Sequence, residues 1–155
     1  MKALLLVLGT LFVYQASAQS NSLDEFFNAH HNSEEVNKIQ LGKFALTFAG
    51  WFIDDPTARK IAKKSNSARF LITEGKHRVT KSNVERLFKQ LDREGFESLI
   101  NIRDGKDKIE LLILEENDSI KNVVGIVSSS DEFLLANFNC NLNKAELESL
   151  ITQSF

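Results

Sequence analysis

The three histidines are the residues of this sequence best suited to metal binding or proton transfer. His30 and His31 are adjacent, and His77 stands between two cations. Neighbouring side chains on a helix point about 100° apart, whereas zinc ligands on one helix are usually separated by several residues. The cations beside His77 disfavour both a bound metal ion and a protonated ring. We therefore predict no metal site and no cofactor.

Asp54 and Asp55 could serve as the paired carboxylates of an acid–base catalyst. Both also have a simpler structural role, because Asp55 precedes Pro56 in a pattern that begins a helix and Asp54 closes the preceding aromatic segment. The sequence contains no nucleophile elbow, phosphate loop, dinucleotide-binding glycine motif or His-Glu-x-x-His helix. These patterns favour a protein that is not an enzyme. The alternative is an enzyme whose site combines dispersed residues, such as one of the three histidines and a nearby carboxylate.

Positive charge is concentrated between Arg59 and Lys81, where eight lysines and arginines accompany a single acid, Glu74. In an exported protein, such a surface could meet anionic lipid headgroups, an acidic polysaccharide or an acidic protein. The competing interpretation is a solvated surface whose charge is balanced by acids elsewhere in the fold. We predict a binding face, with an anionic envelope component or an acidic protein as partner, from the four cations that share one side of a helix: Arg59, Lys60, Lys63 and Lys64.

Cys140 is the only cysteine, so the chain cannot form an intramolecular disulfide. It lies on the more apolar face of an alternating segment, together with Leu134, Ala136 and Phe138. Free cysteine is among the most buried residue types. We therefore predict a buried, unreactive thiol, and the alternative is a mixed disulfide or a disulfide-linked dimer.

The first 18 residues have the pattern of a cleavable signal peptide. Lys2 is followed by an apolar run of 11 residues, Ala3 to Val13, and then by small residues ending at Ala18. A spanning helix needs roughly 20 apolar residues. We therefore expect a signal peptide over residues 1–18 and an exported chain, periplasmic or secreted, without a transmembrane segment. The whole chain carries 19 lysines and arginines against 21 acids, which argues against nucleic acid as a partner.

Helices and strands are predicted most clearly in the second half of the chain. An amphipathic helix is expected from a cap at Ser82 to Gly95, followed by strands near 96–103 and 108–115 around a tight Asp104–Asp107 turn. Two further strands, 120–128 and 133–140, lead to a final helix. Asn143 and Glu146 form a capping box at the start of that helix.

The first half is less regular. A capping box at Ser22 predicts a short helix on the outside of the domain, and residues 36–41 alternate as in a short strand. Residues 42–53 have the spacing of a helix with a broad aromatic face, Pro56 begins a basic helix, and residues 70–72 form a buried strand. We therefore predict one α+β domain over residues 19–155, with an antiparallel or mixed sheet of four to six strands and helices packed mainly on one face.

This order of elements resembles an exported bacterial family, domain of unknown function 4252. The resemblance rests on the signal peptide and on five short runs: Phe26-Phe27, Lys43-Phe44-Ala45-Leu46, Ile61-Ala62-Lys63-Lys64, Phe70-Leu71-Ile72 and Arg93-Glu94-Gly95-Phe96-Glu97-Ser98-Leu99. It implies a location in the Gram-negative envelope and no known activity, cofactor or catalytic residue. Many members carry a lipoprotein cysteine near the cleavage site, which this chain lacks. We therefore expect a binding or interaction module of the bacterial envelope. The alternatives are the dispersed-site enzyme and a regulatory partner of an envelope signalling system.

Overall fold

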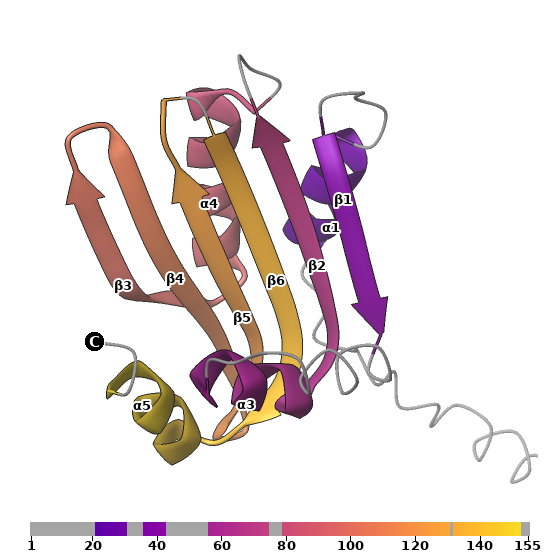
Figure 1. Ribbon diagram of the computed structural model, residues 1–155, viewed down its shortest axis with the longest axis vertical. Coiled ribbons are helices and arrows are strands. Elements are labelled where there is room, and N and C mark those ends of the chain that lie inside the picture. Colours follow the sequence, from indigo (N-terminus) through magenta and orange to yellow (C-terminus); the bar gives the residue numbers. More distant parts are fainter. Residues whose placement is uncertain (1–20, 31–35, 43–55, 75–78, 131, 153–155) are drawn as a thin grey trace, which may run out of the picture.

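The computed structural model describes residues 21–30, 36–42, 56–74, 79–130 and 132–152 (Figure 1). Its centre is a six-stranded sheet in the order β1-β2-β6-β5-β4-β3, in which every neighbouring pair is antiparallel. The strands are β1 (Val36–Gly42), β2 (Ser65–Glu74), β3 (Phe96–Asp104), β4 (Asp107–Glu116), β5 (Ser119–Ser128) and β6 (Glu132–Leu142). The helices are α1 (Asn21–Ala29), α3 (Pro56–Lys64), α4 (Lys81–Arg93) and α5 (Lys144–Thr152). The predicted α+β class and the antiparallel sheet are confirmed.

Tight turns connect β3, β4 and β5. Gly105 has a φ of 59° in the first turn, and Asn117 and Asp118 have φ values of 51° and 59° in the second. In the second turn both central residues have positive φ, which defines a hairpin turn whose twist matches that of the strands, and Asn and Asp tolerate this conformation better than most residues. The predicted hairpins are therefore confirmed, with each strand slightly longer than expected.

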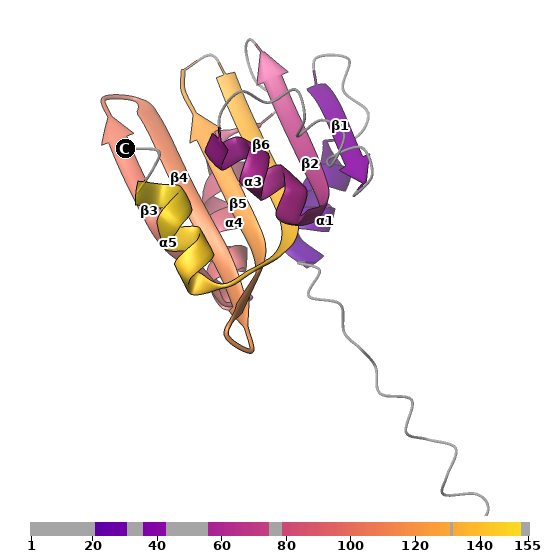
Figure 2. The same ribbon diagram turned by 60° about the horizontal axis from the view of Figure 1, so that its bottom comes forward.

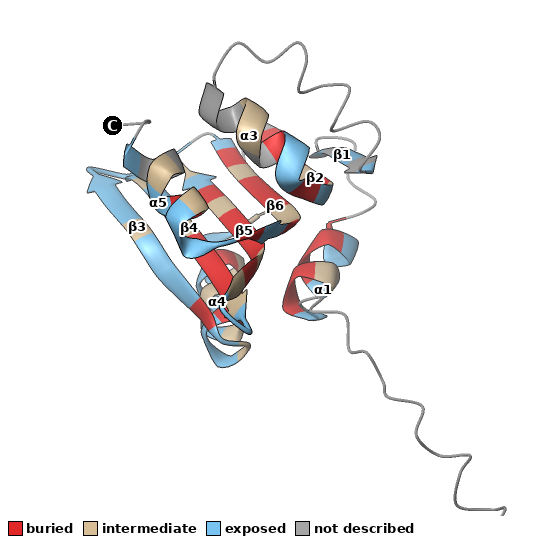
Figure 3. Ribbon diagram, turned by 90° about the horizontal axis from the view of Figure 1, so that it is seen from below, coloured by how far each residue is buried: buried red, intermediate tan, exposed pale blue. Residues whose placement is uncertain are grey.

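Helices cover both faces of the sheet, so the expectation that they lie mainly on one face was wrong. Helices α1 and α4 lie on one side, and α3 and α5 lie on the other (Figures 2 and 3). Along β4, Leu112 and Leu114 join the core beneath α1 and α4, while Ile113 between them packs with Leu147 of α5. Successive side chains of a strand point to opposite faces. An unbroken apolar run such as residues 111–114 therefore needs cover on both sides.

Helix α1 is part of the core and not an outer helix. Its Leu23, Phe26 and Phe27 are buried in the cluster shared with α4. Ser22 lies inside the helix, where its backbone N–H and its hydroxyl both donate to Oε1 of Glu94, at the end of α4. Ser22 is therefore not the cap that the sequence suggested; it links the start of α1 to the end of α4.

The cap of α4 is Thr80 and not Ser82. Thr80 has an extended backbone, and its Oγ1 accepts a hydrogen bond of 3.2 Å from the N–H of Asn83. At the other end, Gly95 adopts a φ of 90° one residue after the C-cap, as expected for a helix-ending glycine. The cap of the helix is thus two residues earlier than predicted.

The predicted cap of α5 is confirmed. The side-chain Oδ1 of Asn143 accepts from the N–H of Glu146 at 2.8 Å, and the N–H of Asn143 donates to Oε2 of Glu146 at 3.0 Å. Leu142 and Leu147, on either side of the cap, are buried in the same cluster. This is the reciprocal arrangement of a capping box with a hydrophobic staple.

Several predicted features fall outside the described residues. These are the signal peptide, Asp54 and Asp55, and all of the aromatic helix except Gly42, which is the last residue of β1. Among the residues that the structure does describe, no helix is long and apolar enough to cross a membrane.

Candidate functional site

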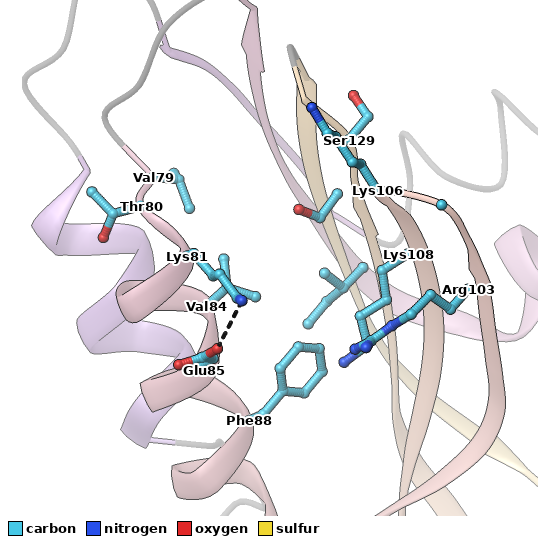
Figure 4. A pocket seen from close by; sticks show the side chains of 13 residues that line it. Val79, Thr80, Lys81, Val84, Glu85, Phe88, Arg103, Lys106, Lys108 and Ser129 are labelled. Carbon is cyan, nitrogen blue, oxygen red and sulfur yellow. Dashed lines mark ion pairs between the residues drawn. The ribbon is translucent and has the colours of Figure 1, made fainter.

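A groove of about 610 Å³ lies between the start of α4 and the ends of β3, β4 and β5 (Figure 4). Val84 and Phe88 of α4 line one side, and Ile126 of β5 faces them. The charged side chains of the lining are one acid, Glu85, and four cations: Lys81, Arg103, Lys106 and Lys108. A volume of this size is typical of a small-molecule site.

Strand register explains why these cations converge. Arg103 and Lys108 are direct partners in the β3–β4 ladder, so both side chains leave the same face of the sheet. This face is the one that α4 covers, and both side chains extend toward Phe88 (Figure 4). Lys106 lies in the turn, and Lys81 comes from the first turn of α4. The positive end of the α4 dipole adds to this charge.

Lys108 is already engaged within the protein. Its ammonium lies 4.1 Å from the centre of the Phe88 ring and 2.5 Å from Oε2 of buried Glu110. The other carboxylate oxygen of Glu110 accepts a long hydrogen bond of 3.5 Å from Asn101. Because Lys108 already contacts a carboxylate and an aromatic face, it attracts a further anion only weakly.

Arg103 and Lys106 carry the exposed charge of the groove. Both side chains are exposed, and neither forms an ion pair with the part of the chain that the structure describes. Lys81 lies 3.8 Å from Glu85, a contact in which both side chains are largely exposed and which contributes little. The hairpin side of the groove is therefore the part best able to bind an anion.

The predicted binding residues lie on the opposite face of the sheet, together on α3. Arg59 and Lys60 are half-buried there, and Lys63 and Lys64 are exposed. The ammonium of Lys64 is 2.9 Å from Oε1 of Glu146, on α5. The N–H of Asn143 and the ammonium of Lys64 hold the pKa of the Glu146 carboxyl below its usual value. Part of the α3 charge is thus compensated inside the protein.

The basic stretch is divided between the two faces. Arg69 of β2 points to the side of α1, where its guanidinium pairs with Asp24 and lies 4.6 Å from the centre of the Phe27 ring. Lys81 reaches the groove, and Lys76 lies outside the described residues, as does Arg78. The cations that the sequence groups together therefore do not form one surface.

Of the three histidines, the structure describes His30. Its ring is buried at the end of α1, where Nδ1 is 2.8 Å from the carbonyl oxygen of Phe26 and the two rings are 4.5 Å apart. Because a carbonyl only accepts, Nδ1 carries the proton. His31 and His77 lie outside the described residues. Within the described ranges, no three His, Cys, Asp or Glu side chains are grouped as metal ligands.

The prediction for Cys140 is confirmed. The thiol is buried, and its Sγ–H donates to the carbonyl oxygen of Ile120 at 3.5 Å. Burial raises the pKa of the thiol to about 11, although nearby Lys121 acts weakly in the opposite direction. At neutral pH the group is therefore a thiol and a poor nucleophile.

Sequence reasoning missed the groove because the hairpin looks electrically balanced. Its acids and bases alternate from Arg103 to Lys108, so three bases accompany two acids and the local net charge is only +1. The register places Arg103 opposite Lys108 and Asp104 opposite Asp107. Like charges directly opposite each other destabilise a ladder. Pairing the two strands outward from the predicted turn would have shown that like charges lie opposite each other in this hairpin.

The fold and the groove define a small α+β protein built on one antiparallel sheet, with an open basic groove at one end. The sequence model of one family, Domain of unknown function (DUF4252), matches residues 27–150. The chain belongs to this family, as its resemblance suggested. The matched region includes both the groove and the α3 cations. No curated protein compared with the chain matches it.

Proposed function

We propose that this protein is an exported binding module of the bacterial envelope, and that the groove beside α4 is where it binds an anionic group. The observation that supports this most directly is the pair Arg103 and Lys106. They are two cations at the mouth of a groove, and neither has an acidic partner in the described structure. Export is supported by the N-terminal pattern of residues 1–18.

The α3 cations are a second proposed contact surface, for an anionic envelope component or an acidic protein. Lys63 is exposed and has no ion pair among the described residues, which supports this surface. The Lys64–Glu146 pair weakens it, because the carboxylate already offsets part of the helix charge. We therefore place the groove first.

Two matched double variants test this order. Arg103→Glu with Lys106→Glu reverses charge at the groove, and Lys60→Glu with Lys63→Glu reverses charge by the same amount on α3. Inorganic phosphate is titrated into each protein and followed by amide chemical shifts. We expect shifts centred on residues 80–85 and 103–108, and binding roughly tenfold or more weaker in the groove variant, because charge-assisted hydrogen bonds are lost.

The α3 variant controls for net charge and should change phosphate affinity by far less. Equal losses in both variants would show only a general response to charge and would contradict a groove site. A larger loss in the α3 variant would place the binding surface on α3.

A further inference from the structure

We infer that the natural occupant of the groove is a single amphiphilic anion, with an oxyanion head such as phosphate on an alkyl body. This inference rests on the proposed function, because it names the chemistry of the ligand at the same site. Three observations support it: the apolar part of the lining, the small number of available cations and the acids that lie beside the groove at the hairpin turn.

The lining is apolar where α4 faces the sheet. Val79 and Phe88 are only partly buried, and both pack against the main core cluster. Buried Val84 and Ile126 complete this part of the lining. The ammonium of Lys108 lies over the Phe88 ring of this lining and pairs with Glu110, and lysine stems commonly cover apolar surface. A small hydrated anion would leave this surface in contact with water, whereas an alkyl chain would cover it.

The charge available suits one head group. Lys108 is held by Glu110, and Lys81 lies beside Glu85. This leaves Arg103 and Lys106, both on the hairpin side of the groove (Figure 4). Two neighbouring cations match a single phosphate or carboxylate better than they match a long polyanion.

Two acids lie next to these cations in the hairpin turn, outside the groove. Asp104 and Asp107 are exposed direct partners on either side of Gly105 and Lys106, and their side chains leave the face of the sheet opposite to Arg103 and Lys108. A flat anionic membrane pressed against the hairpin would meet both carboxylates, and like charges repel. A single molecule entering the groove avoids them. The geometry therefore favours one bound amphiphile over docking on a membrane surface.

A chain-length series tests the inference on the unmodified protein. Inorganic phosphate, butyl phosphate, hexyl phosphate and octyl phosphate are titrated below their micelle concentrations, with octyltrimethylammonium as a control that has the same tail and the opposite charge. Each added pair of methylenes should tighten binding roughly tenfold until the groove is filled. The cationic control should bind at least tenfold more weakly than octyl phosphate.

Variants locate the head group. Arg103→Gln with Lys106→Gln should weaken octyl phosphate roughly tenfold, and Lys60→Gln with Lys63→Gln, which removes the same charge from α3, should not. Phosphate binding could be lost in the groove variant and yet have the same affinity at every chain length. That result would overturn the inference of an amphiphilic ligand and leave the proposed function intact. Absence of binding to any phosphate would refute both. Binding to anionic vesicles without binding to octyl phosphate would show that the protein binds a membrane surface, and would overturn the inference.

Discussion

The two faces of the sheet are built differently. On the side of α1 and α4, fourteen buried apolar residues of the described chain form one cluster that includes side chains from both helices and five strands. On the side of α3 and α5, the corresponding cluster contains six of the residues whose side chains are described. Among the described residues, the α4 side thus forms the larger apolar core (the thick face), and the α5 side combines fewer buried apolar side chains with polar contacts (the thin face).

The difference continues to the hairpin end of the sheet. On the α4 side, this end opens into the basic groove. On the other side, Ile102, Ile109 and Val127 form a row across three strands and remain 43, 45 and 38 % exposed. One sheet therefore offers a charged groove on its thick side and an apolar row on its thin side. The thick core fixes α4 firmly against the strands, which makes the groove the better-positioned site.

The largest expected effect compares one leucine from each face. Leu87 of α4 is fully buried, and Leu147 of α5 retains 7 % exposure in the smaller cluster. Truncation of a buried leucine costs roughly 2–5 kcal/mol, and less where neighbours can relax into the space. We expect Leu87→Ala near the upper end of this range and Leu147→Ala near the lower end, measured by urea unfolding. A larger loss for Leu147→Ala would contradict the assignment of thick and thin faces.

The reactivity of Cys140 gives the next effect. The thiol lies in the smaller cluster, and its pKa is raised from an ordinary 9.0 to about 11. The thiolate fraction at pH 8 is therefore about a hundredfold below that of an unperturbed cysteine, and burial slows attack further. A thiol reagent should label the native protein slowly and the urea-unfolded protein at once.

The same labelling reaction separates the two faces. Leu147→Ala loosens the cluster that contains Cys140 and should accelerate labelling under native conditions. Leu87→Ala belongs to the other cluster and should accelerate labelling only through global unfolding. Rapid labelling of the unmodified native protein would show that the thin face is open, and would contradict the buried thiol.

Local patterns in the sequence predicted what depends on neighbouring residues. The Asn143–Glu146 cap, the turn at Gly105 and the burial of Cys140 each follow from a few adjacent positions, and each is confirmed. The Ser82 cap was wrong because Thr80, two residues earlier, takes the same role with equal chemistry. Which of two nearby hydroxyl residues becomes the cap depends on which one has the extended backbone that precedes the helix, and here it is Thr80.

Features that depend on distant pairing could not be read in the same way. Strand β2 lies between β1 and β6, and its partner residues in β6 are 58 to 75 positions further along the chain. The groove requires α4 to lie over a hairpin that follows it, with Arg103 and Lys108 on the covered face. One signal was available: the unbroken run Leu111 to Leu114 indicates a strand buried on both faces.

The smallest effect concerns the polar contacts that hold the thin face. Glu146 joins α5 to α3 through Lys64 and accepts from the N-terminal cap, and both contacts lower the pKa of its carboxyl. A carboxyl whose pKa is lowered in the folded state stabilises the protein above its unfolded pKa, and this contribution disappears as the pH falls through the folded value. We therefore expect Glu146→Gln to be less stable than the unmodified protein at pH 7.

The stability difference should disappear on acidification below 4.5, the usual pKa of this side chain. Unfolding by urea from pH 7 to pH 3 measures it. Asn143→Ala serves as the control, because it removes the uncharged half of the same cap and should cost about 1 kcal/mol at every pH. A Glu146→Gln difference that stays constant over this range would mean that the charge of Glu146 does not stabilise the thin face. In that case the contact between α3 and α5 would depend on packing alone, and the contrast between the two faces would be one of size and not of kind.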